Sequence, residues 1–320
     1  MSVLSVPHGR TARRLEWHFL PPHVRDLVAQ RCGSPVVGAR SQTSGFTPGF
    51  ASVLTCEDGS RHFVKAASVV AQRAFAESYR EEARALGALP AAVPAPSLRW
   101  SHDDDWVVLG IEHVEHVTPP RPWRTEDLDR AVAMLGVVAE ALTPAPPGLA
   151  TATAAEEMAG WPSCWDRVLL QDLGRGLAVP GLAEHGAEAA GLARLALSVT
   201  AGDTLVHADV RDDNVLLAAD GRVLLCDWTW PVRGAAWFDT VALLIGARED
   251  GLDVDAVLVR APLTRDVPAD HVDAVLALHA GYFLVMQAQR VPATSPFLRT
   301  SQRRRAEATW GWLAQRRGWS

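Results

Sequence analysis

Residues 205–228, LVHADVRDDNVLLAADGRVLLCDW, constrain the fold more than any other part of the chain. Two apolar runs, 215–219 and 222–226, have the composition of β-strands. The dipeptide Asp220-Gly221 between them is typical of a two-residue hairpin turn. The stretch therefore predicts a β-hairpin.

The spacing within this hairpin predicts a metal site at its open end. With a two-residue turn, Ala219 lies opposite Arg222, and Asn214 then lies opposite Asp227. Directly opposed residues have Cβ atoms roughly 4.5–5.5 Å apart. An amide oxygen and a carboxylate at that separation can bind one hard cation such as Mg²⁺. Asp209 precedes them in the loop that leads to the same end. The alternative is a polar surface loop followed by an ordinary hairpin.

Size and composition limit the classes of function. A chain of 320 residues can bury a large core, and its length predicts two lobes. With 48% hydrophobic residues, 21% charged residues and a net charge of −6, we expect a soluble globular protein without nucleic-acid or membrane partners. No secretion signal begins the chain and no apolar run approaches about 18 residues, so we expect a cytoplasmic protein. The four cysteines are far apart in the sequence and form no CxxC pair, and we expect them to be buried and reduced: Cys32, Cys56, Cys164 and Cys226.

Two residue types are nearly absent from the chain. Lys65 is the only lysine among 31 basic residues, and Asn214 is the only asparagine. Arginine does not replace lysine where a compact charge must reach a phosphate. Both positions are therefore candidates for a chemical requirement.

The order of apolar runs, turns and helical periodicities predicts two parts. In residues 1–112 we expect a loosely held arm (1–18), a helix from Pro22 to near Gly33, strands at 52–55 and 61–66 that could cover a nucleotide, a helix at 70–89, and a buried strand at 106–112. In residues 113–320 we expect helices at 125–142, 161–170, 191–199, 239–247 and 272–289, and an amphipathic basic tail at 296–320.

These polar residues match the requirements of phosphoryl transfer. The reaction needs a cation at the phosphates, metal ligands, a group that orients the nucleophile, and a cover over the phosphates. Lys65 can contact the α- and β-phosphates, and one of Glu77, Glu81 and Glu82 can hold it in place. Asp209 can accept the proton of an incoming hydroxyl. Arg211 is either a positive charge near the γ-phosphate or an exposed loop arginine.

The same residues resemble a known family. His207-Ala208-Asp209 with Asn214, followed by Asp227-Trp228, is similar to the HxDxxxxN and DW signature of aminoglycoside phosphotransferase and choline-kinase-like enzymes. The resemblance implies a bilobal α+β, protein-kinase-like fold, with a small β-rich N-lobe and a larger, mostly helical C-lobe. It also implies ATP and Mg²⁺ as cofactors, with Asn214 and Asp227 as metal ligands.

The resemblance assigns further roles. The segment FVKA at Lys65 is similar to the family's lysine strand, and the following helix selects Glu82 as the partner of that lysine. Backbone groups of the hinge would contact adenine, namely those of Glu112, His113 and Val114. In TSGFTPGF, Ser44 and Gly45 would cover the phosphates, although a full GxGxxG is absent. His207 is expected to brace its loop, and Asp239 to be structural.

Two departures from the family pattern are visible. Ala208 stands where many relatives have glycine, from which we expect little consequence. The segment Gly234-Ala235-Ala236 stands where Gly-Asp-Pro is usual, which affects the local loop and not the chemistry.

The expected function is therefore transfer of the ATP γ-phosphate to a hydroxyl of a small molecule. By resemblance, an antibiotic is the leading acceptor, and acidic residues could receive a cationic aminoglycoside: Glu156, Glu157, Asp166, Glu249 and Asp250. A metabolite hydroxyl of the choline, homoserine or sugar type is the alternative acceptor. A metal hydrolase with His207 and Asp209 as ligands, and an inactive nucleotide-binding protein, are alternative classes. The sequence leaves open the acceptor, ATP or GTP preference, and oligomeric state.

Overall fold

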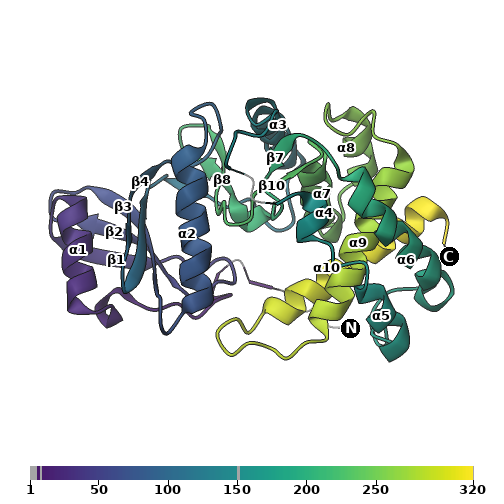
Figure 1. Cartoon of the computed structure of the whole chain (residues 1–320), viewed down its shortest axis with the longest axis horizontal. Coiled ribbons are helices and arrows are strands. Elements are labelled where there is room, and N and C mark those ends of the chain that lie inside the picture. Colours follow the sequence, from purple (N-terminus) through teal and green to yellow (C-terminus); the bar gives the residue numbers. More distant parts are fainter. Residues whose placement is uncertain (1–5, 8, 150–151, 320) are drawn as a thin grey trace.

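The computed structural model describes residues 6–7, 9–149 and 152–319, and an antiparallel sheet forms its N-terminal part (Figure 1). The sheet has five strands in the order β1-β2-β3-β5-β4. Their bounds are β1 Val36–Ser41, β2 Phe50–Cys56, β3 Arg61–Ser68, β4 Leu98–Asp103 and β5 Trp106–Ile111. The predicted strands at 52–55, 61–66 and 106–112 correspond to β2, β3 and β5, whereas β1 and β4 were not predicted.

Helices α1 and α2 cover opposite faces of this sheet (Figure 1). Helix α1 (Pro22–Cys32) has proline in its first turn and ends at Gly33, whose left-handed φ of 80° closes the helix. It packs on the face that carries Phe50, Leu54 and Val64. Helix α2 (Arg73–Ala88) lies on the other face, between the sheet and the rest of the chain.

The later part of the chain is mostly helical. Its helices are α3 Thr125–Ala141, α4 Ala154–Glu157, α5 Cys164–Gln171, α6 Leu182–Val199, α7 Phe238–Glu249, α8 Val254–Arg260, α9 Ala269–Gln287 and α10 Leu298–Arg317. Helix α9 is buried on nearly all sides, with α5, α6 and α10 packed on it. Buried tryptophans fill this core, among them Trp165, Trp310 and Trp312. No helix in the described ranges combines the length and apolarity needed to cross a membrane.

The later part also contains short strands, which lie on the side nearest the five-stranded sheet (Figure 1). Strands β6 (His116–Val117), β8 (Val215–Ala218) and β9 (Val223–Leu225) form one small sheet, and β7 (Thr204–Val206) pairs with β10 (Val232–Gly234). A β-rich N-terminal part followed by a mostly helical part confirms the predicted α+β, protein-kinase-like architecture.

The predicted hairpin forms, but its register is one residue away from the predicted one. Val215 pairs with Leu225, and residues 219–221 form a three-residue turn. Gly221 adopts φ of 90° in this turn. A three-residue loop that contains a left-handed glycine is a common hairpin connection, and the Asp-Gly dipeptide occurs in it as well as in two-residue turns. The prediction of a two-residue turn was wrong for this reason.

The register shift changes which residues face each other at the open end. Ala219 does not lie opposite Arg222, and Asn214 lies beside Cys226, whose N–H donates to the Asn214 carbonyl at 3.0 Å. A one-residue shift turns a side chain to the other face of a strand. Asp227 leaves the strand conformation instead, with a left-handed φ of 68°. This conformation directs its carboxylate into the cavity that Asn214 also lines.

Two other predictions were wrong in part. Residues 9–18 of the arm are not loosely held, because Thr11 and Ala12 are buried and the Thr11 hydroxyl donates to the Gly45 carbonyl at 2.6 Å; residues 1–5 and 8 lie outside the described ranges. Of the cysteines expected to be buried, Cys56 is buried, whereas Cys32, Cys164 and Cys226 are half-buried. Cys32 and Cys56 lie close together, because the end of α1 and the end of β2 meet at one corner of the sheet.

Candidate active site

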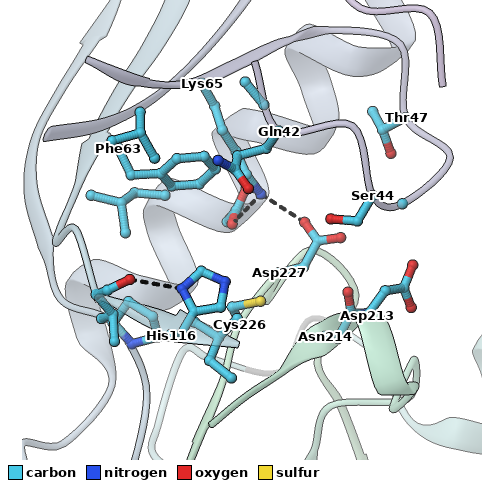
Figure 2. Close-up of a pocket in the computed structure, with 18 of the residues that line it drawn as sticks. Gln42, Ser44, Thr47, Phe63, Lys65, His116, Asp213, Asn214, Cys226 and Asp227 are labelled. Carbon is cyan, nitrogen blue, oxygen red and sulfur yellow. Dashed lines mark hydrogen bonds and ion pairs between the residues drawn. The ribbon is translucent and has the colours of Figure 1, made fainter. Parts of the chain in front are cut away.

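A cavity lies between the five-stranded sheet and the β8–β9 hairpin (Figure 2). The predicted residues that line it are Ser44, Gly45, Lys65, Glu82, Glu112, His113, Val114, Asn214 and Asp227. Asp209 and Arg211 line a second cavity next to it. Phe46 borders both cavities. The fold therefore brings the predicted site residues to one junction between the sheet and the helical part.

Lys65 is held between two carboxylates. Its Nζ lies 2.7 Å from both Glu82 carboxylate oxygens and 2.7 Å from Asp227 Oδ1 (Figure 2). Of the three glutamates considered for this contact, Glu82 is the one that the turn of α2 directs at the sheet, and it is 1% exposed. Burial by itself would lower the pKa of Lys65, but Asp227 and Glu82 raise it above its ordinary value. Lys65 is therefore a fixed positive charge in the cavity wall.

Asp227 and Asn214 present oxygen atoms suited to a hard cation. Burial opposes ionisation of Asp227, but the adjacent Lys65 ammonium holds its pKa well below its usual range, so it is a carboxylate at neutral pH. The Asn214 side-chain N–H donates to the Asp209 carbonyl at 2.9 Å, which leaves the amide oxygen for the cavity. Figure 2 shows that oxygen turned toward Asp227. The pair fits Mg²⁺, which prefers oxygen ligands.

Asp209 has the environment of a general base. Burial raises its pKa to about 6, and the nearby Arg211 guanidinium opposes this rise. Arg211 Nη2 lies 3.4 Å from Asp209 Oδ2, and its Nε donates to Asp213 Oδ1 at 3.0 Å. Arg211 is thus a largely buried residue held by two carboxylates and not an exposed loop arginine, and its role beside the γ-phosphate stays a prediction.

His207 and Asp239 hold the loop that carries Asp209. His207 accepts from the Asp209 N–H at Nδ1 (3.2 Å), and its Nε2 therefore donates to the Cys226 carbonyl at 2.9 Å. Burial lowers the pKa of His207. The Asp239 carboxylate accepts the N–H groups of His207 and Ala208 at 2.7 and 2.9 Å. Both side chains engage backbone atoms, as expected for bracing residues and not for ligands of a hydrolytic metal.

Ala208 adopts a backbone conformation that glycine favours. Its φ is 64°, in the left-handed region. A residue with a side chain costs about 1–2 kcal/mol there. The loop between His207 and Asp209 is therefore strained, and the expectation that alanine has little consequence stays a prediction.

The hinge lines the cavity with its backbone. Ile111 ends β5, and the Glu112 carboxylate points away to accept from the Ser97 hydroxyl at 2.9 Å. Two backbone groups are already engaged: the Glu112 N–H donates to Ser97 at 2.8 Å, and the Val114 carbonyl accepts from His116 Nδ1 at 2.7 Å. The His116 ring itself lies in the cavity (Figure 2).

The loop between β1 and β2 closes the cavity and is held from two sides. Arg14 donates to the Ser44 carbonyl at 2.9 Å, and the Ser295 hydroxyl donates to the Phe46 carbonyl at 2.6 Å. Gly45 has a φ of 77° and lies so close to Arg14 that an added Cβ would be 3.4 Å from its Nη2. The loop is therefore tied to the N-terminal arm and to the segment before α10.

The sequence analysis missed several residues of the cavity. Arg14 lines it, and its buried Nε has no hydrogen-bond partner within the described ranges. Tyr79 lies over Lys65, with Nζ 5.6 Å from the ring centroid. Asp213 lies beside Asn214 (Figure 2). Asp213 could have been found by its position next to the only asparagine, whereas nothing in the sequence places Arg14 here.

The second cavity, of about 470 Å³, is bounded by Asp209 and by helices of the C-terminal part. Trp161 and Tyr282 stack in its wall, with ring centroids 4.0 Å apart and an interplanar angle of 12°. Its volume lies in the range of small-molecule sites, about 300–1,000 Å³. An acceptor bound here would adjoin the carboxylate of Asp209.

Comparison with solved structures identifies proteins of similar fold. An aminoglycoside phosphotransferase, APH(4)-Ia, in a ternary complex with ADP and hygromycin B superposes with a TM-score of 0.60, at 13% identity over 92% of this chain and 98% of that one. The chain has the protein-kinase-like fold of aminoglycoside phosphotransferases and choline kinases. The aminoglycoside phosphotransferase of Alicyclobacillus acidocaldarius has a TM-score of 0.57, with 16% identity over 88% of this chain and 92% of that one.

The choline kinase LicA of Streptococcus pneumoniae has a TM-score of 0.58, with 14% identity over 91% of this chain and 99% of that one. In sequence, the chain matches no family model and none of the curated proteins.

Proposed function

We propose that the protein is a Mg²⁺-dependent kinase that transfers the γ-phosphate of ATP to a hydroxyl of a small molecule. One observation carries this proposal: the Lys65–Glu82 pair and the oxygens of Asn214 and Asp227 share one cavity, and Asp209, whose carbonyl accepts from Asn214, lines the next cavity. In this proposal residues 1–112 bind the nucleotide, and residues 113–320 supply the catalytic and acceptor-binding groups. Structural neighbours in complex with ADP support the nucleotide.

Each residue has a defined task in the transfer. The acceptor oxygen attacks the γ-phosphorus, so that one O–P bond forms while the bond to the β,γ-bridging oxygen breaks. Asp209 takes the proton of the acceptor hydroxyl, and ADP leaves with the electron pair of the broken bond. Lys65 contacts the α- and β-phosphates, and Arg211 supplies positive charge beside the transferred group. The hinge backbone at Glu112, His113 and Val114 contacts adenine, and Ser44 and Gly45 cover the phosphates.

Asn214 and Asp227 would hold the metal ion. When bound there, Mg²⁺ would supply positive charge that neutralises the negative charge developing during transfer. Asp227 also contacts Lys65 at 2.7 Å, so the ammonium and the metal-binding carboxylate are positioned together. Loss of either side chain should therefore weaken nucleotide binding.

The acceptor belongs to a hydroxyl-bearing class. The structural neighbours include a complex with hygromycin B and a choline kinase, so an antibiotic and a metabolite hydroxyl both have precedents on this fold. We propose an antibiotic or related natural product as the acceptor, with resistance to that compound as the consequence.

Nucleotide binding and turnover test the proposal. We expect MgATP to bind in a calorimetric titration and ADP to be released in its presence, and we expect Asp209→Asn to bind MgATP while turnover falls about 10²–10⁴-fold. Asp227→Asn should lose Mg²⁺-dependent binding. Asp220→Asn, in the exposed hairpin turn, is the matched control and should behave like the parent protein.

The outcomes separate the alternatives. MgATP binding without turnover in the presence of any hydroxyl compound or water would identify a nucleotide-binding protein instead of a kinase. Turnover at the parent rate in Asp209→Asn would refute the role of that residue as the base. A parallel series with GTP decides the nucleotide preference.

A further inference from the structure

The charges around the second cavity do not suit a polycation. Its carboxylates are Asp209, which is assigned to the reaction, and Glu157. Two positively charged guanidiniums also line this cavity, those of Arg211 and Arg305. His279 also lines the cavity, and burial lowers its pKa to about 4, so it is neutral at physiological pH.

The other acidic residues expected to receive a cation are engaged or lie elsewhere. Glu156 caps α4 through Thr153. Glu249 pairs with Arg304 at 2.9 Å, and Asp250 accepts the Trp123 N–H at 2.9 Å. Asp166 does not line the cavity.

Arg305 differs from the other arginines of α10. Most of these pair with carboxylates: Arg303 with Glu307, Arg304 with Glu249, Arg316 with Asp273, and Arg317 with Glu188. Arg299 bonds to Gln302. Within the described ranges no hydrogen bond or ion pair joins the Arg305 guanidinium to another residue, and it lies over the Phe283 ring, 5.9 Å from the centroid. Its charge acts on nearby carboxylates, those of Asp209, Asp212 and Glu249, but none of them accepts a hydrogen bond from it, so its N–H groups can donate to a ligand in the cavity.

Aromatic side chains form part of the remaining cavity wall. Besides the stacked pair of Trp161 and Tyr282, the cavity is lined by Phe46, Phe283 and Trp230, and Trp230 is 53% exposed. Flat aromatic side chains bury a flat ligand face at little conformational cost.

We propose that the acceptor is an anionic hydroxyl compound with a flat apolar ring, whose ring packs on the aromatic wall and whose anionic group binds Arg305. This inference rests on the proposed phosphotransferase function and specifies its acceptor. Arg211 cannot serve in place of Arg305, because Asp209 and Asp213 already hold it. A polycation such as an aminoglycoside would meet two guanidiniums and only one carboxylate not assigned to the reaction, so the proposal excludes that class.

Three matched probes test the charge preference: 4-(hydroxymethyl)benzoate, 4-(hydroxymethyl)benzamide and 4-(hydroxymethyl)benzylamine, with hygromycin B as the polycation. They share one ring and one hydroxyl and differ in charge. We expect probe-dependent ADP release and a phosphorylated product with kcat/KM highest for the carboxylate and lowest for the amine. A preference for the amine or for hygromycin B, or no turnover with any of the three while water supports ADP release, would overturn the proposal. Absence of MgATP binding would refute the kinase itself.

A second measurement assigns the preference to Arg305. In Arg305→Gln the ratio of kcat/KM for the carboxylate to that for the amide should fall about tenfold or more, since a hydrogen bond between two charged groups is lost. The ratio cancels any effect of the variant on phosphate chemistry. Arg303→Gln, on the same helix and paired with Glu307, is the control and should keep the parent ratio. An unchanged ratio in Arg305→Gln would overturn the assignment.

A separate cluster lies at the corner where α1 meets the sheet. Cys32 and Cys56 each offer a sulfur and His62 a ring nitrogen, and these atoms all lie within 4.8 Å of one another. The Ser60 hydroxyl donates to Asp58 Oδ1 at 2.6 Å, so it accepts from His62 Nε2 at 3.0 Å. These two hydrogen bonds place the proton of His62 on Nε2 and leave the lone pair on Nδ1. Carboxylates commonly orient metal-binding histidines through such hydrogen bonds.

We infer that Cys32, Cys56 and His62 form a site for a soft divalent cation such as Zn²⁺, remote from the proposed active site. Two thiolates and one imidazole are ligands that Zn²⁺ prefers, and three protein ligands leave one position for water. Burial raises the pKa of Cys32 to about 12, so metal binding would release a proton from this thiol.

Cobalt substitution tests this site without reference to activity. We expect Co²⁺ added to the reduced protein to give thiolate charge-transfer absorption that Zn²⁺ abolishes, and Cys32→Ser and His62→Ala to lose or alter it. Cys164→Ser, a half-buried cysteine elsewhere in the chain, should retain it. No thiolate band, or the same band in Cys32→Ser and Cys56→Ser, would overturn the site.

Discussion

We predict that Arg211 sets the pH at which Asp209 can act as the proposed base. Burial raises the pKa of Asp209 to about 6, and the Arg211 guanidinium, 3.4 Å from the carboxylate, limits that rise. Asp209 accepts a proton only when it is ionised, so turnover should increase as the pH rises through about 6. Removing the positive charge of Arg211 should move this increase to higher pH.

The size of the expected pH shift follows from the distance between the Arg211 guanidinium and the Asp209 carboxylate. Two unit charges 3.4 Å apart attract by about 1.2 kcal/mol in water and about 5 kcal/mol at an effective dielectric constant of 20. The Asp209 side chain is 36% exposed, so solvent screening favours the lower part of this range. An attraction of about 1.4 kcal/mol corresponds to about one pKa unit. We therefore expect the acid limb of Arg211→Gln to lie about one pH unit above that of the parent protein.

The assay is the pH dependence of kcat/KM for MgATP, followed by ADP release, which reports ionisations of the free enzyme. The position of the limb is the readout, since the rate itself should fall when the charge beside the γ-phosphate is lost. Arg303→Gln is the control and should leave the limb in place. An unchanged limb, or one displaced to lower pH, in Arg211→Gln would refute the electrostatic coupling of the two residues.

Three further predictions concern the same region. Glu82→Ala should lower the free energy of unfolding by about 3 kcal/mol, since it removes one partner of a buried ion pair. Denaturant titration measures this free energy, and a decrease below about 1 kcal/mol would contradict the prediction. Ala208→Gly should raise that free energy by up to about 1 kcal/mol by relieving the left-handed strain, and a clear loss of stability would be inconsistent with strain. Arg14→Ala should raise KM for MgATP about tenfold, because a charged donor lining the cavity is lost. Arg13 is its exposed neighbour, so Arg13→Ala is the control and should leave KM unchanged. Equal effects of the two variants would exclude a contact between Arg14 and the nucleotide.

Local patterns in the sequence were sufficient for the main elements and for the order of the site residues. Apolar periodicity located α2, α3 and α9 to within a few residues, because the buried face of a helix repeats every 3.6 residues. Strands β1 and β4 were missed, since their burial alternates over only a few residues and neither carries a strong apolar run.

Residue type and spacing indicated the chemistry, and the resemblance assigned Glu82 to Lys65. The structure shows the physical reason: Glu82 is on the face of α2 that turns toward β3, whereas Glu77 and Glu81 pair with half-buried arginines of the same helix, Arg80 and Arg84. The sequence thus determined which groups were available for phosphoryl transfer.

The tertiary structure alone decided how these groups are placed. The hairpin register depends on turn geometry that an Asp-Gly pair does not specify, and the left-handed conformation of Asp227 brings its carboxylate to the cavity that Asn214 also lines. Arg14 reaches the cavity through contacts between segments distant in sequence. The pKa of Asp209 and the availability of Arg305 depend on burial and on neighbouring charges, which exist only once the chain has folded.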